Sequence, residues 1–327
     1  MKLDFETLQS ITFGAVRTWK TENGNVGYAR VTENEEEGWR AVRDVLGNRA
    51  KAAAGIRFDF HTDADSFTLS LPRGHKVDVW FNDVLCHQLL FDDLKKEGKE
   101  PTVTVPIRGP LGEKYDECRV TLWLSAHWIC EVAYLALDGA TFVRPHEYKH
   151  KLLFLGDSIA HGWNGVNDSM GYTSRIARFF DADCVLAAVG GGIFAPTTIE
   201  DNGFNPDAIL IAYGTNDFTG RPSFESLCQN CDEYLDKIKA IYPGRPVFVV
   251  TPTFRKDNQP RNAGGFAEVR QAITERAEAR GFYVIDGGKI LPPSDLYFAG
   301  DGVHPNDLGF AEMALHVIPA MKDVLGW

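Results

Sequence analysis

The sequence predicts an all-β domain followed by an α/β domain with a parallel sheet, and three observations lead to this prediction. The chain has 327 residues, which is enough for two domains. Hydrophobic residues recur with a period of two in the first part of the chain, whereas strand-like and helix-like segments alternate in the second part. Between the two parts, residues 138–150 contain a glycine, a proline and a polar run typical of a linker. We therefore expect domains at residues 1–148 and 149–327.

The first domain is predicted to be a β-sandwich of the jelly-roll type. Apolar and polar residues alternate in residues 67–71, 77–81, 103–105 and 120–124, as they do in strands that bury one face. Residues 35–46 are an exception, because apolar residues at helical spacing follow an acidic first turn there. Many short strands with no helices alternating between them are typical of a sandwich.

The second domain is predicted to contain βαβ units, in which helices join parallel strands and cover both faces of the sheet. Its strands are short and apolar, and its helices are amphipathic. The last helix has the clearest pattern, since Phe310, Met313, Val317 and Met321 make one apolar stripe. We expect strands at residues 152–155, 184–188, 208–213, 247–250 and 283–285, and helices at residues 172–180, 225–241, 263–280 and 307–324.

Composition and charge exclude several classes of function. Hydrophobic residues make up 44% of the chain and charged residues 24%, which is ordinary for a globular protein. The formal net charge of −11 argues against a nucleic acid or an anionic membrane as a partner, because both require clustered Lys and Arg. The first ten residues show no secretory signal, and no stretch approaches the ~18 apolar residues of a membrane span. We therefore expect a cytoplasmic protein.

The six cysteines are scattered, and we expect reduced thiols. Cys228 and Cys231 form a C-x-x-C, but no second C-x-x-C and no nearby histidine completes a zinc site. We assign the pair no redox or metal-binding role.

Three polar segments of the second domain lie beside predicted strands or helices. They are residues 156–159 (GDSI), 214–217 (GTND) and 301–306 (DGVHPN). The first segment alone is as typical of an ordinary turn with a helix cap as of a catalytic site, and each of the other two alone is more typical of a turn or a helix start than of a catalytic site. Parallel α/β proteins gather reactive groups at the carboxyl ends of strands, so the presence of all three segments in one domain favours a catalytic site.

Ser158, His304 and Asp301 are candidates for a nucleophile with its base. A serine hydroxyl is a poor nucleophile at neutral pH unless a base removes its proton as it attacks. His304 is the candidate base, and Asp301 precedes it by three residues on a tight turn. That spacing allows the carboxylate to accept from Nδ1 while Nε2 faces the serine.

The same segments offer donors for an oxyanion. The side chain of Asn216 carries an NH₂ group, and the backbone N–H of Ser158 is well placed. A third N–H could come from the Gly190-Gly191-Gly192 run, because a residue with no Cβ allows close approach. Asp157 and Asp217 are expected to brace their turns.

Taken together, these residues resemble the SGNH hydrolases, the superfamily of GDSL-type esterases and lipases. Ser158 matches the nucleophile and first oxyanion donor of that superfamily. Gly191 best matches the glycine of the second motif, although either neighbouring glycine could be the equivalent. Asn216 matches the asparagine of the third motif, and Asp301 and His304 match the D-x-x-H of the last.

The resemblance covers roughly residues 151–327 and implies a three-layer α/β/α fold with no metal and no organic cofactor. Ala160 stands where the nucleophile elbow of the α/β-hydrolases has glycine, which argues against that family. The preceding β domain is similar in layout to two-domain enzymes of carbohydrate esterase family 2. Some of those enzymes use a Ser-His dyad, whereas this chain has Asp301 in place.

The resemblance implies a serine esterase that removes a small acyl group, most simply acetyl, from a sugar or polyol. Trp163, Phe194, Phe218 and Phe254 adjoin the motifs and are candidates to stack on a pyranose, although core positions are equally compatible with their sequence. The expected partner is a small-molecule or oligosaccharide ester. Two alternatives remain at this point, an acyltransferase that uses the same three residues and a non-catalytic carbohydrate-binding protein.

Overall fold

Contacts within the computed structural model, which describes residues 1–327, group the chain into two units. The division differs from the expected domains at two places, because a helical segment of the first part joins the second unit and a short turn of the second part joins the first. Unit 1 comprises Met1–Arg30, Lys51–Tyr148 and Asn167–Ser169, and unit 2 comprises Val31–Ala50, Lys149–Val166 and Met170–Trp327.

Unit 1 is built from antiparallel sheets. One sheet has the order β1-β4-β9-β6-β7 with β12 paired to β4, a second has the order β11-β5-β8, and a third has the order β10-β3-β2. Two short helices also occur, so the unit is not purely β. The elements are α1 (Phe5–Ser10), β1 (Thr12–Phe13), β2 (Arg17–Lys20), β3 (Val26–Ala29), β4 (Arg57–Thr62), β5 (Ser66–Ser70), β6 (Lys76–Phe81), β7 (Val84–Leu90), α4 (Phe91–Lys96), β8 (Thr102–Pro106), β9 (Cys118–Leu124), β10 (Glu131–Val132), β11 (Tyr134–Asp138) and β12 (Val143–Pro145).

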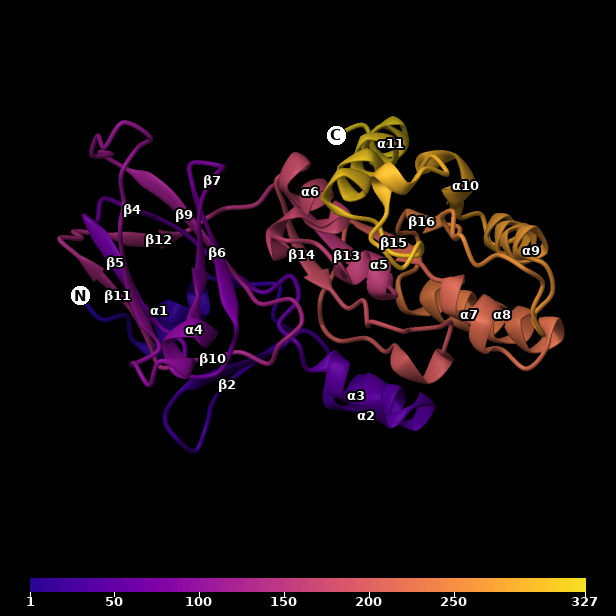
Figure 1. Cartoon of the computed structure of the whole chain (residues 1–327), viewed down its shortest axis with the longest axis horizontal. Coiled ribbons are helices and arrows are strands. Elements are labelled where there is room, and N and C mark those ends of the chain that lie inside the picture. Colours follow the sequence, from indigo (N-terminus) through magenta and orange to yellow (C-terminus); the bar gives the residue numbers. More distant parts are fainter. The chain divides into compact units, whose positions relative to one another are not determined.

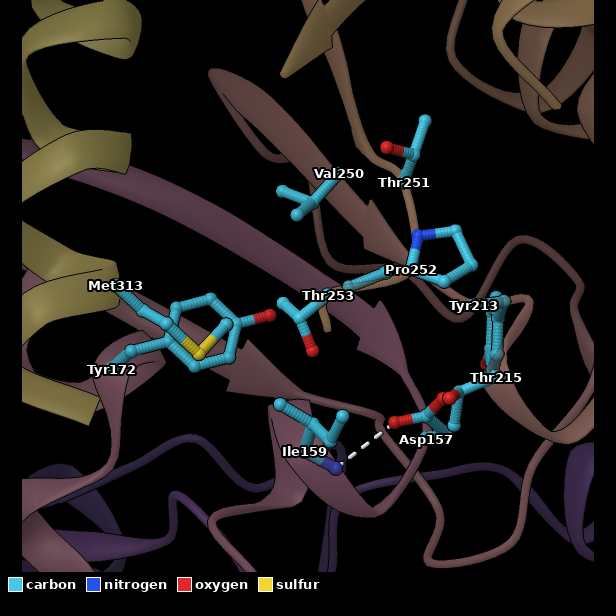
Figure 2. A pocket seen from close by; sticks show the side chains of 11 residues that line it. Asp157, Ile159, Tyr172, Tyr213, Thr215, Val250, Thr251, Pro252, Thr253 and Met313 are labelled. Atoms are coloured by element: carbon cyan, nitrogen blue, oxygen red, sulfur yellow. Dashed lines mark hydrogen bonds between the residues drawn. The ribbon is translucent and has the colours of Figure 1, made fainter. Parts of the chain in front are cut away.

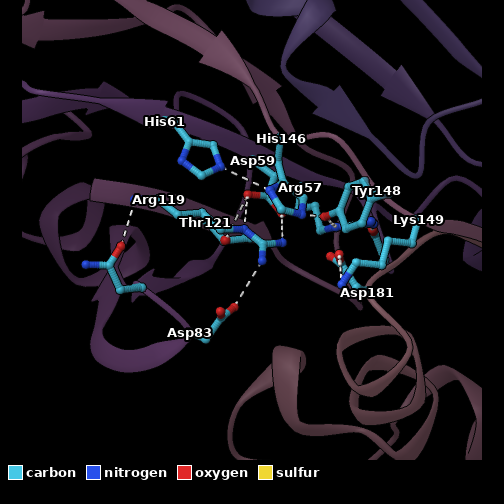
Figure 3. Close-up of polar contacts among 12 residues, drawn as sticks. Arg57, Asp59, His61, Asp83, Arg119, Thr121, His146, Tyr148, Lys149 and Asp181 are labelled. Atoms are coloured by element: carbon cyan, nitrogen blue, oxygen red, sulfur yellow. Dashed lines mark hydrogen bonds and ion pairs between the residues drawn. The ribbon is translucent and has the colours of Figure 1, made fainter. Parts of the chain in front are cut away.

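Strand β4 shows how the period of two builds unit 1. Phe58 and Phe60 enter the hydrophobic core that the strands of the sheets share. Arg57 and Asp59 point to the other face but are buried as well. On that face, the carboxylate of Asp59 accepts a hydrogen bond of 2.7 Å from Nη2 of Arg119, and other residues of the unit complete the cluster (Figure 3). The sequence pattern predicts the core face of this strand, but the polar face carries a buried charge network that the pattern does not predict.

Unit 2 contains the parallel sheet, and each strand and helix predicted for the second domain is present. Its elements are α2 (Glu33–Val42), α3 (Asp44–Ala50), β13 (His150–Gly156), α5 (Ser158–His161), α6 (Tyr172–Phe179), β14 (Ala182–Leu186), η2 (Pro196–Thr198), β15 (Ala208–Ala212), α7 (Thr215–Gly220), α8 (Phe224–Ile241), β16 (Val247–Val250), α9 (Phe266–Glu278), β17 (Tyr283–Ile285), α10 (Gly287–Ile290), η3 (Asp295–Tyr297) and α11 (Asp307–Leu325), while η1 (Asp168–Met170) lies at the boundary with unit 1.

The sheet of unit 2 has the order β14-β13-β15-β16-β17, with all strands parallel. The chain moves from β13 to β14 in one direction and then from β15 to β17 in the other. Because such crossovers are right-handed, α6 and the pair α8 and α9 cover opposite faces of the sheet. Helix α11 packs on α6, and α8 packs on α9, which gives three layers (Figure 1). The change of direction lies between β13 and β15, where α/β proteins of this type bind their ligands.

Helices α2 and α3 belong to unit 2, which corrects the expectation that residues 35–46 form one helix of the first domain. Helix α2 begins after Thr32, whose hydroxyl accepts from the N–H of Glu35 at 3.0 Å, and it ends at Val42. Trp39 is fully buried, with its ring 6.5 Å from that of Tyr213. An amphipathic helix needs an apolar partner, and its place in the sequence does not tell which domain supplies that partner.

No helix of the structure is both long enough and apolar enough to cross a membrane. All six cysteines, including the pair on α8, are free thiols.

Close packing of α2 predicts that Gly38→Ala destabilises unit 2. A Cβ at Gly38 would lie 2.0 Å from the carbonyl oxygen of Thr197, so the helix must move. We expect a loss of about 1–3 kcal/mol in the free energy of unfolding, as for overpacked cores. Urea denaturation measures the loss. Gly220→Ala is the control, because nothing lies within 4 Å of a Cβ there, and equal stability of the two variants would contradict the packing of α2.

Candidate active site

Ser158 lies two residues after the end of β13, an inner strand of the parallel sheet. Strand β13 ends at Gly156, Asp157 is the N-cap of the short helix α5, and Ser158 is its first residue. The carboxylate of Asp157 accepts from the N–H of Ile159 at 2.9 Å, as a capping side chain does. The backbone N–H of Ser158 has no acceptor in the protein, because the first N–H groups of a helix lack one. The serine therefore offers both a hydroxyl and a free N–H at the end of the strand.

The structure brings Ser158, His304 and Asp301 into one hydrogen-bonded chain. Oγ of Ser158 lies 2.7 Å from Nε2 of His304, and Nδ1 of His304 lies 2.7 Å from Oδ2 of Asp301. Ser158 and His304 are 146 positions apart in the sequence, so the fold alone joins them. This geometry allows the imidazole to take the serine proton while the carboxylate orients the ring.

The carboxylate of Asp301 is positioned by its own turn. Oδ1 accepts from the N–H groups of Val303 and His304, both at 3.0 Å, and Gly302 has a φ of 67°, which favours glycine. Partial burial would raise the pKa of Asp301, but these donors and the imidazole outweigh it and lower the pKa to about 2. Nδ2 of Asn164 also donates to Oδ2 at 3.3 Å. The group beside the imidazole is therefore a carboxylate at neutral pH.

Asn216 is placed by the neighbouring strand. Strand β15 pairs with β13 so that Ala212 lies opposite Gly156, and the segments after both strands leave the sheet at the same edge. Gly214 turns the chain into α7 with a φ of 116°, where a Cβ would lie 2.6 Å from the side chains of Ile273 and Pro252. Only glycine fits this turn.

The asparagine and glycine motifs meet at one hydrogen bond. Nδ2 of Asn216 donates to the carbonyl oxygen of Gly192 at 3.0 Å, and a second N–H of the amide stays free to bind another oxygen. The N–H of Gly192 is already used, since it donates to Val189 at 2.7 Å. Gly191 has a φ of 86° and an N–H with no acceptor in the protein. These bonds favour Gly191 over Gly192 as a candidate oxyanion donor, beside the candidates Ser158 and Asn216.

The four aromatic candidates divide into two groups. Trp163 is half-buried, with its ring 6.4 Å from that of His304, and Phe254 is half-buried against Phe298. Phe194 and Phe218 have no exposed surface. This burial corrects the expectation that they contact substrate, because a ring with no exposed surface cannot stack on a sugar. Both belong to the core. The sequence could not separate packing in the core from stacking on a sugar, because both roles are compatible with an apolar ring beside a motif.

Two buried carboxyls brace the turns of the site, as expected for Asp157 and Asp217. Oδ1 of Asp217 accepts from the N–H of Phe194 at 3.2 Å and from Nε of Arg221 at 3.0 Å. Burial raises the pKa of Asp217 to about 6, although Arg221 lowers it. Burial also raises the pKa of Asp157 to about 7, although the N–H of Ile159 lowers it, and the charge of Asp217 raises it further.

A small cavity lies beside Asp157 under the turn that carries the serine. Figure 2 shows the side chains that line it, among them Tyr172 and Thr253, whose hydroxyl groups are buried with no hydrogen-bond partner in the protein. The volume is about 20 Å³, which suffices for about one water molecule. The cavity is thus too small to bind an acyl group or a sugar.

Three residues near the site were missed by the sequence analysis. Asn164 has a φ of 72° and donates to Asp301, and an asparagine in a turn shortly after Ser158 was the available signal. Arg43 and Arg49 lie beside Gly191, but they come from α2 and α3, which the sequence assigns to another domain. No local pattern could have connected them to the site.

The chain matches the model of the GDSL-like lipase/acylhydrolase family over residues 154–311. These residues include Ser158, Gly191, Asn216 and the Asp301–His304 turn. A comparison with curated protein sequences gave no match.

Several solved structures have a similar fold over nearly the whole chain. The salicylyl-acyltransferase SsfX3 from a tetracycline biosynthetic pathway has a TM-score of 0.79 at 18% identity, covering 96% of this chain and 94% of that chain. A GDSL-like lipase from Bacteroides ovatus has a TM-score of 0.72 at 18% identity, covering 98% and 97%. A family two carbohydrate esterase from Cellvibrio japonicus has a TM-score of 0.68 at 16% identity, covering 98% and 97%. Identities this low show a shared fold.

The raised pKa of Asp157 predicts a pH-dependent stability. Folded Asp157 binds a proton up to about pH 7, whereas an unfolded aspartate loses it near pH ~3.9, so the contribution of this group is full below pH ~3.9 and is lost as the pH rises through about 7. Asp157→Asn keeps the acceptor for Ile159 and removes the titration. We expect the free energy of unfolding of the variant, relative to wild type, to rise between pH 4 and pH 8.

Urea denaturation at each pH measures this difference. Asp323→Asn, which removes an exposed carboxylate from α11, controls for the change in net charge. A difference between Asp157→Asn and wild type that stays constant across the pH range would contradict the prediction.

Proposed function

Residues 154–311 belong to the GDSL-like lipase/acylhydrolase family of SGNH hydrolases, and from this premise we propose that the protein is a serine esterase that removes a short acyl group, most simply acetyl, from a sugar or polyol. The observation that carries the proposal is the hydrogen-bonded chain of Ser158, His304 and Asp301, with 2.7 Å at each step. It supports nucleophilic catalysis and argues against a protein that only binds carbohydrate, since binding alone does not require these two hydrogen bonds.

In the proposed mechanism, Oγ of Ser158 attacks the ester carbonyl while Nε2 of His304 takes its proton. His304 then gives this proton to the leaving alcohol, and an acyl-serine forms. Water attacks the acyl group in the second half of the reaction, with His304 again as the base. Asp301 fixes the ring and stabilises the imidazolium. Because the pKa of Asp301 is lowered, its side chain is a carboxylate over the whole neutral pH range and can do so.

The oxyanion would be bound by the N–H groups of Ser158 and Gly191 and by Nδ2 of Asn216. The backbone donors have no other acceptor in the protein, and the amide keeps one free N–H. Donors positioned before the reaction need no reorganisation as the charge develops, and each contributes about 3 kcal/mol to lowering the barrier.

The carbohydrate part of the proposal draws on Trp163 and on the fold. The half-buried indole lies beside His304, where it could stack on a sugar. The structural neighbours include family two carbohydrate esterases and an acetyl xylan esterase from Butyrivibrio proteoclasticus, whose names refer to carbohydrate or acetyl esters. We also propose that the antiparallel sheets of unit 1 form a jelly-roll-like module, as the layout of the chain predicts.

Substitution of the proposed nucleophile tests the function. Ser158→Ala removes the only oxygen that can form the acyl-enzyme, so we expect kcat/KM for 4-nitrophenyl acetate to fall at least about 10³-fold at neutral pH. Ser226→Ala on α8 is the matched control and should retain activity. Circular dichroism verifies that both variants are folded. Equal rates for wild type and Ser158→Ala would mean that Ser158 is not the nucleophile.

An acyltransferase is the second candidate function, favoured by the likeness to SsfX3. The side chains of His304 and Asp301 are 20% and 42% exposed, so water reaches the proposed base. A transferase has to exclude water from its acyl-enzyme. We therefore expect free acetate as the main product when 4-nitrophenyl acetate is turned over with glycerol present. Acetylated glycerol as the main product, measured by mass spectrometry, would assign the protein to the transferases.

A further inference from the structure

Two arginine side chains meet beside the backbone of Gly191. Arg43 directly follows α2 as its C-cap and Arg49 lies on α3, within the same unit as the proposed catalytic residues. A Cβ on Gly191 would lie 2.9 Å from Nη2 of Arg43 and 3.0 Å from Nη1 of Arg49. Both guanidinium groups therefore approach one point of the backbone, next to a proposed oxyanion donor. The mechanism above uses neither of them.

Arg49 is fixed in this place by two further contacts. Its Nη1 donates to the carbonyl oxygen of Gly190 at 2.7 Å, and its guanidinium lies 5.5 Å from the centre of the Trp163 ring. The same indole lies 6.4 Å from the ring of His304. Arg49 thus connects the glycine segment to the side of the site where the imidazole acts.

The guanidinium of Arg43 provides a positive charge at the same point. Its side chain is exposed, and its guanidinium has no acceptor in the protein. Burial, and then the charge of Arg43, lowers the pKa of Arg49. Two cations held close together repel each other, and an anion that contacts both would relieve this repulsion. The whole chain carries a net charge of −11, so it does not attract anions in general, and the attraction at this point is local.

We propose that Arg43 and Arg49 bind a carboxylate of the substrate, so that the protein prefers esters that carry this group close to the ester carbonyl. Guanidinium groups match the planar carboxylate with paired hydrogen bonds. For a carbohydrate substrate, this chemistry corresponds to a uronic acid that is acylated on a hydroxyl and keeps its carboxylate free, and for a smaller polyol it corresponds to a hydroxy acid acylated in the same way. The inference rests on the proposed function, because it specifies the substrate of the same site.

Two pairs of esters that differ by one charge test the proposal. In 3-acetoxybenzoate and 3-acetoxybenzamide the difference lies in the alcohol part, and in the 4-nitrophenyl esters of succinate and of succinate monomethyl ester it lies in the acyl part. The quantity compared is the ratio of kcat/KM for the charged ester to that for the neutral ester. The ratio is measured in wild type and in Arg43→Gln. Because both esters of a pair are measured with the same enzyme, a change in activity that affects all substrates equally does not alter the ratio.

We expect Arg43→Gln to lower this ratio about ten-fold for at least one pair, because hydrogen bonds to charged groups are the strong ones. The pair that responds shows whether the carboxylate belongs to the alcohol or to the acyl part. Arg40→Gln is the matched control, since it removes the same charge from α2, but Arg40 is already paired with Glu36 and Glu37 at 2.9 Å. Its ratio should equal that of wild type.

Equal losses of kcat/KM on the charged and neutral esters would assign Arg43 to the oxyanion or to the fold, and no loss on either ester would show that it binds no carboxylate. Either result overturns the proposal while the esterase function stands. If wild type hydrolyses none of the esters, titration calorimetry on Ser158→Ala measures the binding of the charged and the neutral compound without turnover. Tighter binding of 3-acetoxybenzoate than of 3-acetoxybenzamide, lost when Arg43→Gln is added, supports the carboxylate site, and equal binding of both compounds overturns it.

Discussion

The parallel pairing of β13 with β15 is the constraint on which the site of this protein depends. Their register sets Gly156 opposite Ala212, so the segments that carry Ser158 and Asn216 leave the sheet at one edge. The chain changes direction across the sheet between these strands, which is where α/β proteins of this type bind their ligands. Strand β14 pairs with β13 on the other side and delivers Gly191 to the same place. Three of the motif segments are therefore positioned by backbone hydrogen bonds of one sheet.

His304 is positioned at this edge by the packing of a helix and not by hydrogen bonds of the sheet. It lies on the turn before α11, whose apolar stripe is buried and which packs against α6. The turn is held to neighbouring backbone as well, since the N–H of Ala299 donates to the carbonyl of His304 at 2.8 Å and that of Lys256 donates to Gly302 at 2.9 Å. The imidazole is thus held by burial of a helix and by a few local bonds, while Asp301 is fixed relative to it by the turn itself.

How far the sequence predicts the site depends on how local each relation is. Asp301 and His304 are three residues apart, and a side chain that accepts from the next N–H groups is a common turn, so this pair could be predicted. The strands and helices of unit 2 could be predicted as well, because a strand buried on both faces leaves an apolar run and a helix buried on one face leaves a helical period in the sequence. The roles of Phe194 and Phe218 could not, since an apolar ring fits a core and a sugar site equally well.

The sequence by itself determined the α/β class of the second unit, the candidate catalytic residues and the turns that carry them. These properties depend on periodicity and on side chains near each other in the chain. Only the tertiary structure decided that the segment from Val31 to Ala50 belongs to unit 2, that Arg43 and Arg49 reach Gly191, and that the polar face of β4 is buried. Each of these is a contact between distant segments, for which an amphipathic face specifies the need for a partner but does not identify it.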